Sequence, residues 1–238
     1  MEFEFRQNWK IKSLDEWIAR FSKSKKNEEG RSAKTLAEFC KRDDAEKIIA
    51  ETLHPVVGKI DSMTAYPEYH TKIDDYGKGR IHDLALKCSC GKGNVFVGIE
   101  AKVNEGFGRY LKSVYNSSKE NSNIKNRING LLSYYDGMIS LDTNPNIPYQ
   151  LFYSAVSVLK EEVVVKAEES RIFLIIVFNT DKSDEKKVKK NKEKLCDFLT
   201  AINAKEQHEY RNESTEYYEA KLKGQKLNII YKKIDMTK

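Results

Sequence analysis

Residues 81–103 read IHDLALKCSCGKGNVFVGIEAKV, and this stretch decides the fold. Ile81 to Cys88 and Val95 to Val103 are rich in apolar and β-branched residues, as strands are. Between them, Ser89 to Asn94 is dense in glycine and other turn-forming residues. A connection this short joins antiparallel neighbours. The stretch therefore predicts two adjacent antiparallel strands.

A third strand is expected before this pair. The hydrophobic period changes near Tyr66, and the segment Tyr69 to Ile73 favours a strand. Asp74 to Gly79, which follows, contains two aspartates and two glycines and is typical of a turn. We therefore expect three consecutive strands in an antiparallel meander.

Helical periodicity precedes the meander. Apolar residues recur at helical intervals in the first segment, at Leu14, Trp17, Ile18 and Phe21. Residues 22–30 then favour a loop. A second helix is expected from Ser32, which suits the N-cap position, with a break near 42–44 and an end near Pro55. We therefore divide the chain into an N-terminal helical extension, residues 1–30, and a main domain, residues 31–238.

The second half of the chain alternates helices and strands. Residues 171–178 (RIFLIIVF) are almost all apolar, as in a strand buried on both faces. The other expected elements are a helix near 124–132, a helix from Tyr149 to about Val163, a lysine-rich helix over 185–203 and a strand over 226–233. This order predicts an α/β domain with a mixed sheet and helices on both faces.

Composition narrows the class of protein. Hydrophobic residues make up 39% of the 238 residues, which is enough for a packed core. No apolar run approaches the roughly 20 residues that span a bilayer. The first residues, MEFEFRQNWK, lack the apolar core of a signal peptide. We therefore expect a cytoplasmic protein without membrane contact. Lysine and arginine number 42 against 36 acidic residues, a net charge of +6 that suits a polyanionic partner without requiring one.

The cysteines give little sign of a disulfide or of zinc. Cys88 and Cys90 are too close in sequence for a good internal disulfide, whereas Cys40 and Cys196 stand alone. Free thiols in a reducing compartment explain all four. A structural zinc ion would need a second pair of ligands besides Cys88 and Cys90. The candidate histidines, His54, His70 and His82, are scattered along the sequence.

Charged side chains gather on one face of the last strand of the meander. Glu100 and Lys102 are two residues apart and project to the same side, where Gly98 leaves space beside them. On the neighbouring strand, Asp83 is expected close to Glu100. Two carboxylates this close repel each other, and a hard divalent ion such as Mg²⁺ or Mn²⁺ resolves the conflict. A lysine beside such an ion can orient or deprotonate an attacking water, as phosphodiester hydrolysis requires.

This arrangement resembles the PD-(D/E)XK nuclease superfamily, which includes many restriction endonucleases. The match is His82-Asp83, a spacer of sixteen residues and then Glu100-Ala101-Lys102, with His82 in place of the proline. The run 99–108 (IEAKVNEGFG) and Tyr149-Gln150-Leu151 also look like an uncharacterised bacterial branch of this superfamily. The resemblance spans roughly residues 32 to 200. It implies a restriction-endonuclease-like α-β-β-β-α-β core within residues 31–238.

The resemblance also implies an activity. Asp83, Glu100 and the backbone carbonyl of Ala101 would bind Mg²⁺ or Mn²⁺, and Lys102 would activate water and stabilise the transition state. The expected substrate is nucleic acid, double-stranded DNA above all, cut to leave a 5′-phosphate. Restriction or defence is a candidate setting, and many similar nucleases are homodimers.

Further residues are candidates by the same resemblance. Such nucleases often add an acidic residue, for which Glu68 is the first choice and Glu38 the second. Glu105 would either reach the same pocket or cap the following segment. Similar enzymes position a nucleotide with Gln-x-x-x-Tyr on a helix, whereas here the spacing from Gln150 to Tyr153 is one residue shorter.

The start of the same helix offers candidate contacts to nucleic acid. Tyr149 and Gln150 lie where unpaired backbone N–H groups attract anions. Arg127 and the lysines between 182 and 194 are candidate phosphate contacts, although a solvated helix explains those lysines better.

Two alternatives remain open from sequence. In the first alternative, Glu100 and Lys102 are an ordinary solvent-facing pair of charged residues on a strand. In the second, the chain is a catalytically inactive, nuclease-like module that binds nucleic acid or a protein partner.

Overall fold

The computed structural model describes residues 1–5, 12–21, 32–76, 79–144, 146–161 and 170–237. Across these residues an eight-stranded mixed sheet has the order β1-β2-β3-β4-β5-β8-β7-β6. Its strands are β1 (Glu2–Phe3), β2 (Ile60–Thr71), β3 (Arg80–Cys90), β4 (Gly93–Lys102), β5 (Ser170–Asn179), β6 (Lys205–Glu206), β7 (Thr215–Leu222) and β8 (Gln225–Asp235). The expected meander is confirmed, because β2, β3 and β4 are antiparallel neighbours. Next to it, β4, β5 and β8 run parallel.

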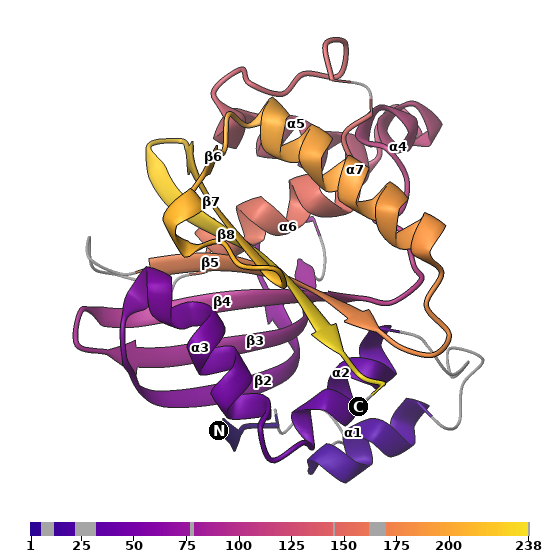
Figure 1. Cartoon of the computed structure of the whole chain (residues 1–238). Helices are drawn as coiled ribbons and strands as arrows, with labels where there is room; N and C mark the ends of the chain where they lie inside the picture. Colours follow the sequence, from indigo (N-terminus) through magenta and orange to yellow (C-terminus); the bar gives the residue numbers. More distant parts are fainter. Residues whose placement is uncertain (6–11, 22–31, 77–78, 145, 162–169, 238) are drawn as a thin grey trace.

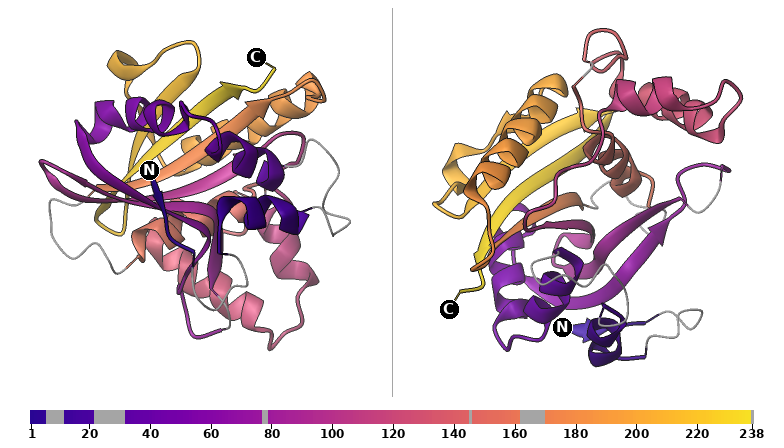
Figure 2. Two further views of the ribbon diagram at one scale, coloured as in Figure 1. Left: turned by 90° about the horizontal axis from the view of Figure 1, so that it is seen from below. Right: turned by 90° about the vertical axis from the view of Figure 1, so that its right-hand side faces the viewer.

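Helices cover both faces of the sheet (Figures 1 and 2). One face packs against α6 (Tyr149–Leu159) and α7 (Glu185–Ala201), with α4 (Leu111–Ser117) and α5 (Asn123–Leu132) beyond them. On the other face lie α1 (Leu14–Phe21), α2 (Ser32–Cys40) and α3 (Ala45–Val57). The protein is therefore an α/β fold in which helices flank a mixed sheet, as expected. None of the helices in the described ranges is long and apolar enough to cross a membrane.

The N-terminal residues contribute to the same core as the rest of the chain. β1 adds a short parallel pair to β2, and Trp17 of α1 is fully buried in the cluster beneath α2 and α3. The break expected near 42–44 separates α2 from α3. The loop expected at 22–30 lies outside the described residues.

β2 departs most from its prediction. We expected a strand over Tyr69 to Ile73, whereas β2 begins nine residues earlier, at Ile60, and ends at Thr71. Among the described residues, β2 pairs along its outer edge with the two-residue β1 alone, and many of its side chains are partly exposed and do not alternate clearly. Glu68, with a left-handed φ of 47°, adds a bend that local sequence does not reveal.

Some elements were not predicted from sequence. The sequence pattern misses β7 and α4, although β7 forms a hairpin with β8 through a turn in which Lys223 and Gly224 have φ values of 48° and 74°. Two glutamates and one lysine interrupt β7, which hides its alternation of buried and exposed positions. The helix expected to run to about Val163 is α6, which ends at Leu159, and residues 162–169 are outside the described ranges.

The packing of α6 on β4 depends on Gly98. A Cβ at this position would lie 2.7 Å from the His82 ring and 2.7 Å from Val158 Cγ2 of α6. The space that sequence reasoning left open beside Gly98 is therefore filled by His82, which is fully buried.

We expect Gly98→Ala to destabilise the protein by about 2 kcal/mol, because neither the buried ring nor the helix can move freely. Gly91→Ala is the matched control, since a Cβ there meets no atom within 4 Å. Denaturation midpoints in guanidinium chloride compare the two. Equal midpoints for both variants would contradict the packing of His82 between β4 and α6.

Candidate active site

The candidate site lies where β3 and β4 separate. The last backbone pair between them is Leu84 with Ile99, and the same register would continue with Asp83 opposite Glu100 and His82 opposite Ala101. The Ala101 N–H instead donates to Asp83 Oδ2, at 2.8 Å. The Asp83 carboxylate thus replaces a backbone partner and lies directly beside the segment Glu100-Ala101-Lys102.

Bending of β2 accompanies this separation. β2 keeps pairing with β3 on both sides of Asp83, through Pro67 with Leu84 and Tyr69 with His82. The left-handed Glu68 lies between these two pairs. β2 and β3 therefore stay together and leave β4, which frees Asp83 for the site.

Glu100 is the centre of the cluster. Its side chain accepts a hydrogen bond from Lys102 Nζ at 2.8 Å and others from Arg80 Nη2 and Gln150 Nε2. Glu100 is 2% exposed and Lys102 is 5% exposed, because α6 covers this face of β4. An ordinary solvent-facing pair on a strand is therefore excluded.

Burial and neighbouring charge shift the pKa values of both acids. Burial, and next the charge of Glu100, raise the pKa of Asp83 from 3.8 to about 7, against the lowering effect of Lys102. For Glu100, burial alone would raise the pKa, but Lys102 and Arg80 lower it below its usual value. Such opposite shifts in two adjacent carboxylates are typical of functional sites.

His82 has a structural role beside the site. Burial, and then the charge of Arg80, lower its pKa to about 3, so the ring is neutral at physiological pH. It packs edge-on against Phe96 and lies 3.3 Å from the Ser157 hydroxyl of α6. His82 thus anchors β3 to α6 immediately before Asp83.

The residues of the site suit a magnesium ion. Mg²⁺ is usually held by one or two carboxylates, with water and substrate oxygens completing its shell. Asp83 and Glu100 supply two carboxylates. A residue in a strand directs its N–H and C=O to the same edge, so the Ala101 carbonyl faces the Asp83 side as its N–H does. No group of three or more His, Cys, Asp or Glu placed to hold a metal ion occurs among the described residues.

The expected acidic supplements lie elsewhere. Glu68 forms an ion pair with Arg20 at 2.9 Å. Glu38 is within 3.6 Å of Lys34 on the surface of α2. Glu105 accepts hydrogen bonds from the Ser32 backbone N–H at 2.8 Å and from the Val103 N–H at 3.2 Å. Glu105 therefore caps the start of α2, an earlier element of the chain, whereas the sequence had suggested a place in the pocket or a cap for the segment after it.

The expected nucleic-acid contacts divide into two groups. Gln150 joins the site through its bond to Glu100. Tyr149 stacks on Tyr153, with ring centroids 5.5 Å apart. Arg127 lies over the Tyr153 ring at 5.5 Å, but its guanidinium also binds the Asp74 carboxylate at 2.6 and 3.0 Å. Arg127 is therefore bound to Asp74 and packs on the Tyr153 ring, which also contacts Arg80, and it does not join the cluster around Glu100.

Arg80 is the site residue that sequence reasoning missed. It lies at the start of β3, its side chain is 15% exposed, and it joins Glu100 across the strand pair while packing 5.8 Å from the Tyr153 ring. Arginine at the end of a turn carries no local signal of this role. Only the divergence of β3 from β4 brings its guanidinium to Glu100.

Asp83→Asn tests the electrostatics of the site. Because the folded-state pKa of Asp83 is raised, its stabilising contribution is complete below pH 4 and is lost as the pH rises toward about 7. We expect the metal-free Asp83→Asn variant to be more stable than wild type at pH 8, by about 2 kcal/mol, and the difference to vanish near pH 4.

Urea unfolding across this pH range provides the measurement. Asp142→Asn is the control, because the Asp142 side chain is 93% exposed and should show no such pH-dependent difference. If wild type and Asp83→Asn were equally stable at pH 8, the buried repulsion between the two acids would be absent.

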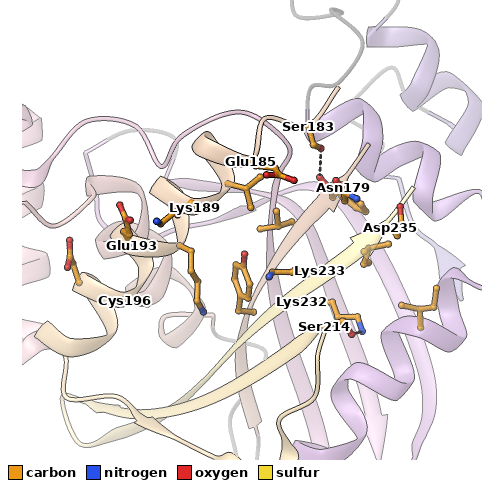
Figure 3. Close-up of a pocket in the computed structure, with 18 of the residues that line it drawn as sticks. Asn179, Ser183, Glu185, Lys189, Glu193, Cys196, Ser214, Lys232, Lys233 and Asp235 are labelled. Atoms are coloured by element: carbon orange, nitrogen blue, oxygen red, sulfur yellow. Dashed lines mark hydrogen bonds between the residues drawn. The ribbon is translucent and has the colours of Figure 1, made fainter. Parts of the chain in front are cut away.

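A separate groove lies between α7 and the C-terminal ends of β5 and β8, with a volume of about 1030 Å³. Figure 3 shows lysines entering from two sides, Lys189 from α7 and Lys232 and Lys233 from β8. Carboxylates of Glu185, Glu193, Asp197 and Asp235 share its lining, so its charge is mixed.

The fold and site together define an α/β protein with a buried acid–lysine–arginine cluster at the end of a diverging strand pair. A family model described as a domain of unknown function (DUF6946) matches residues 10–236, so the chain belongs to this family. Comparison with curated proteins and with solved structures found no match.

Proposed function

We propose that this protein is a Mg²⁺-dependent nuclease that hydrolyses phosphodiester bonds, with DNA as its substrate. The observation that carries the proposal is the convergence of Asp83, Glu100 and Lys102 in one buried cluster. Burying Glu100 and Lys102, with Asp83 and Arg80 partly buried beside them, costs several kcal/mol of desolvation, which a purely structural role would not require. The arrangement combines metal-binding oxygens with a fixed amine, as hydrolysis of a phosphodiester needs.

The order of the elements supports the same proposal. α3, β2, β3, β4, α6 and β5 occur in this order along the chain, with α4 and α5 inserted between β4 and α6, and β5 lies parallel beside β4. We propose that they form the restriction-endonuclease-like α-β-β-β-α-β core. The carboxylates would then stand on its second and third strands, where the PD-(D/E)XK resemblance puts them.

Each residue has a distinct role in the proposed reaction. Asp83, Glu100 and the Ala101 carbonyl would hold Mg²⁺, which when bound polarises the phosphoryl oxygen and stabilises its developing charge. Lys102 would position the attacking water and stabilise the negative charge that develops on the phosphoryl group. The water oxygen would bond to phosphorus, its proton would pass to solvent, and the P–O3′ bond would break with the 3′ oxygen as the leaving group. Gln150, bound to Glu100, would keep that carboxylate oriented. Cleavage would leave the phosphate on the 5′ end.

Purified wild-type protein with plasmid and linear duplex DNA tests the proposal. We expect cutting with Mg²⁺ or Mn²⁺ and none with EDTA. The products should become substrates for end-labelling by polynucleotide kinase only after phosphatase treatment, since their 5′ ends carry phosphate. Absence of cutting of DNA and RNA with either metal, together with no metal-dependent rise in melting temperature, would overturn it.

A non-catalytic binding module is the second candidate, favoured by the groove between α7 and β8. Lys232 there is partly buried and donates to the hydroxyls of Ser214 and Thr215 at 3.0 and 3.1 Å. An anionic partner in the groove would be bound without metal. Metal-independent binding of DNA that is lost in a Lys189→Ala/Lys233→Ala variant, with no cutting, would support the module over the nuclease.

A further inference from the structure

The contacts of Glu100 leave one of its oxygens for a metal. Oε1 accepts hydrogen bonds from both Lys102 and Gln150, which uses the two lone pairs of that oxygen. Oε2 accepts from Arg80. A cation that binds Glu100 must therefore approach Oε2, where the guanidinium of Arg80 already lies.

Charge makes simultaneous occupation unfavourable. The guanidinium and a divalent ion on the same carboxylate oxygen would lie within a few Å of each other, and the site is shielded from water. Repulsion between them is much stronger there than in bulk solvent. The site without metal already balances the two acids with two cations, Lys102 and Arg80. A divalent ion and the ion pair between Arg80 and Glu100 therefore compete.

A second feature of Arg80, its unpaired Nε–H donor, indicates that the residue binds a ligand. Its Nε is buried and has no hydrogen-bond partner within the described ranges. A buried N–H left unpaired is costly and is rarely tolerated without a role. An oxyanion accepting from Nε and a terminal nitrogen together would satisfy the guanidinium, in the bidentate geometry that arginine forms with phosphate.

We propose that Arg80 occupies the metal position on Glu100 in the metal-free protein and, when a divalent ion displaces it, binds the phosphate of the nucleic acid that is to be cut. The Tyr153 ring, 5.8 Å away, would keep the guanidinium at the site after it leaves Glu100. This inference rests on the proposed nuclease function and adds a phosphate-binding residue to it.

Isothermal titration of Mn²⁺ and Mg²⁺ into the metal-free protein tests the first half. We expect Arg80→Met to bind metal at least tenfold more tightly than wild type, because a competing cation has gone. Arg80→Lys keeps the charge and should stay close to wild type. Lys47→Met is the control: it removes a positive charge from the exposed surface of α3, away from Glu100, and should leave metal affinity unchanged. If Arg80→Met does not fold, Arg80→Gln takes its place with the same expectation.

Binding of a short DNA duplex, with Ca²⁺ replacing Mg²⁺ to slow cutting, tests the second half. Arg80→Met should bind the duplex about tenfold more weakly than wild type despite holding metal more tightly. Lys47→Met, on the exposed surface of α3, should change nothing. A guanidinium that merely orients Glu100 would give the opposite pattern, with weaker metal binding in Arg80→Met.

The outcomes separate this inference from the function on which it rests. If wild type binds metal and Arg80→Met binds it no more tightly, or if duplex affinity is unchanged, the role of Arg80 is wrong and the nuclease proposal stands. If only Arg80→Met binds metal, competition is supported. If neither protein binds metal, both proposals fail.

Discussion

Replacing Lys102 with methionine is expected to lower Mg²⁺-dependent DNA cleavage by at least about 1000-fold, because its side-chain nitrogen positions the attacking water and stabilises the negative charge of the transition state. Methionine matches the length of the lysine stem and fills the buried space beside Phe107, over which the amine lies at 5.5 Å. The fold should therefore survive. Cleavage rates under single-turnover conditions measure the effect.

Two further measurements make this result specific. The Lys102→Met variant should still show a rise in melting temperature with Mg²⁺, since both carboxylates remain. Lys47 is an exposed lysine on the opposite face of the sheet, so the Lys47→Met variant should cleave DNA at the wild-type rate. A Lys102→Met protein that cuts DNA at the wild-type rate would show that the amine serves only to neutralise Glu100.

Glu100→Gln is expected to destabilise the metal-free protein by about 3 kcal/mol, because it leaves Arg80 and Lys102 buried near each other without their shared carboxylate. Hydrogen bonds to the neutral amide replace only part of that attraction. Mg²⁺ should no longer raise the melting temperature. Urea unfolding gives the stability difference, and thermal melts with and without Mg²⁺ give the metal response.

A second substitution separates the lost charge from lost packing. Adding Arg80→Met to Glu100→Gln removes one of the two orphaned cations, so the double variant should be more stable than Glu100→Gln alone. The metal response should stay absent in both. If Glu100→Gln were as stable as wild type, the ion pairs around Glu100 would contribute nothing and the site would be more hydrated than its burial indicates.

Local sequence predicted the framework because its signals act over short distances. The alternation in 95–103 and the glycine-rich turn before it define a hairpin, and the register of that hairpin puts Asp83 near Glu100. The apolar run 171–178 predicted β5 for the same reason, since a strand buried on both faces needs little beyond its own composition. β7 escaped prediction because charged residues interrupt it and its partner β8 supplies the pairing.

The immediate neighbours of the acids could not be predicted in the same way. Gln150 is fifty residues from Glu100 in sequence, and Arg80 is twenty, yet both donate to its carboxylate. The expected companion Glu68 is instead bound by Arg20, from α1. These partners depend on how α6 and α1 pack against the sheet, which no single segment encodes.

By itself, then, the sequence determined the strand meander, the α/β class and the acid–lysine trio, because hydrophobic period and turn chemistry are properties of contiguous residues. Tertiary structure alone decided that Glu100 and Lys102 are buried beneath α6. It also decided that the Asp83 carboxylate replaces a backbone partner of Ala101 where β3 leaves β4, and that Arg80 binds Glu100. Burial and charge pairing arise between segments distant along the chain, so they exist only once those segments pack.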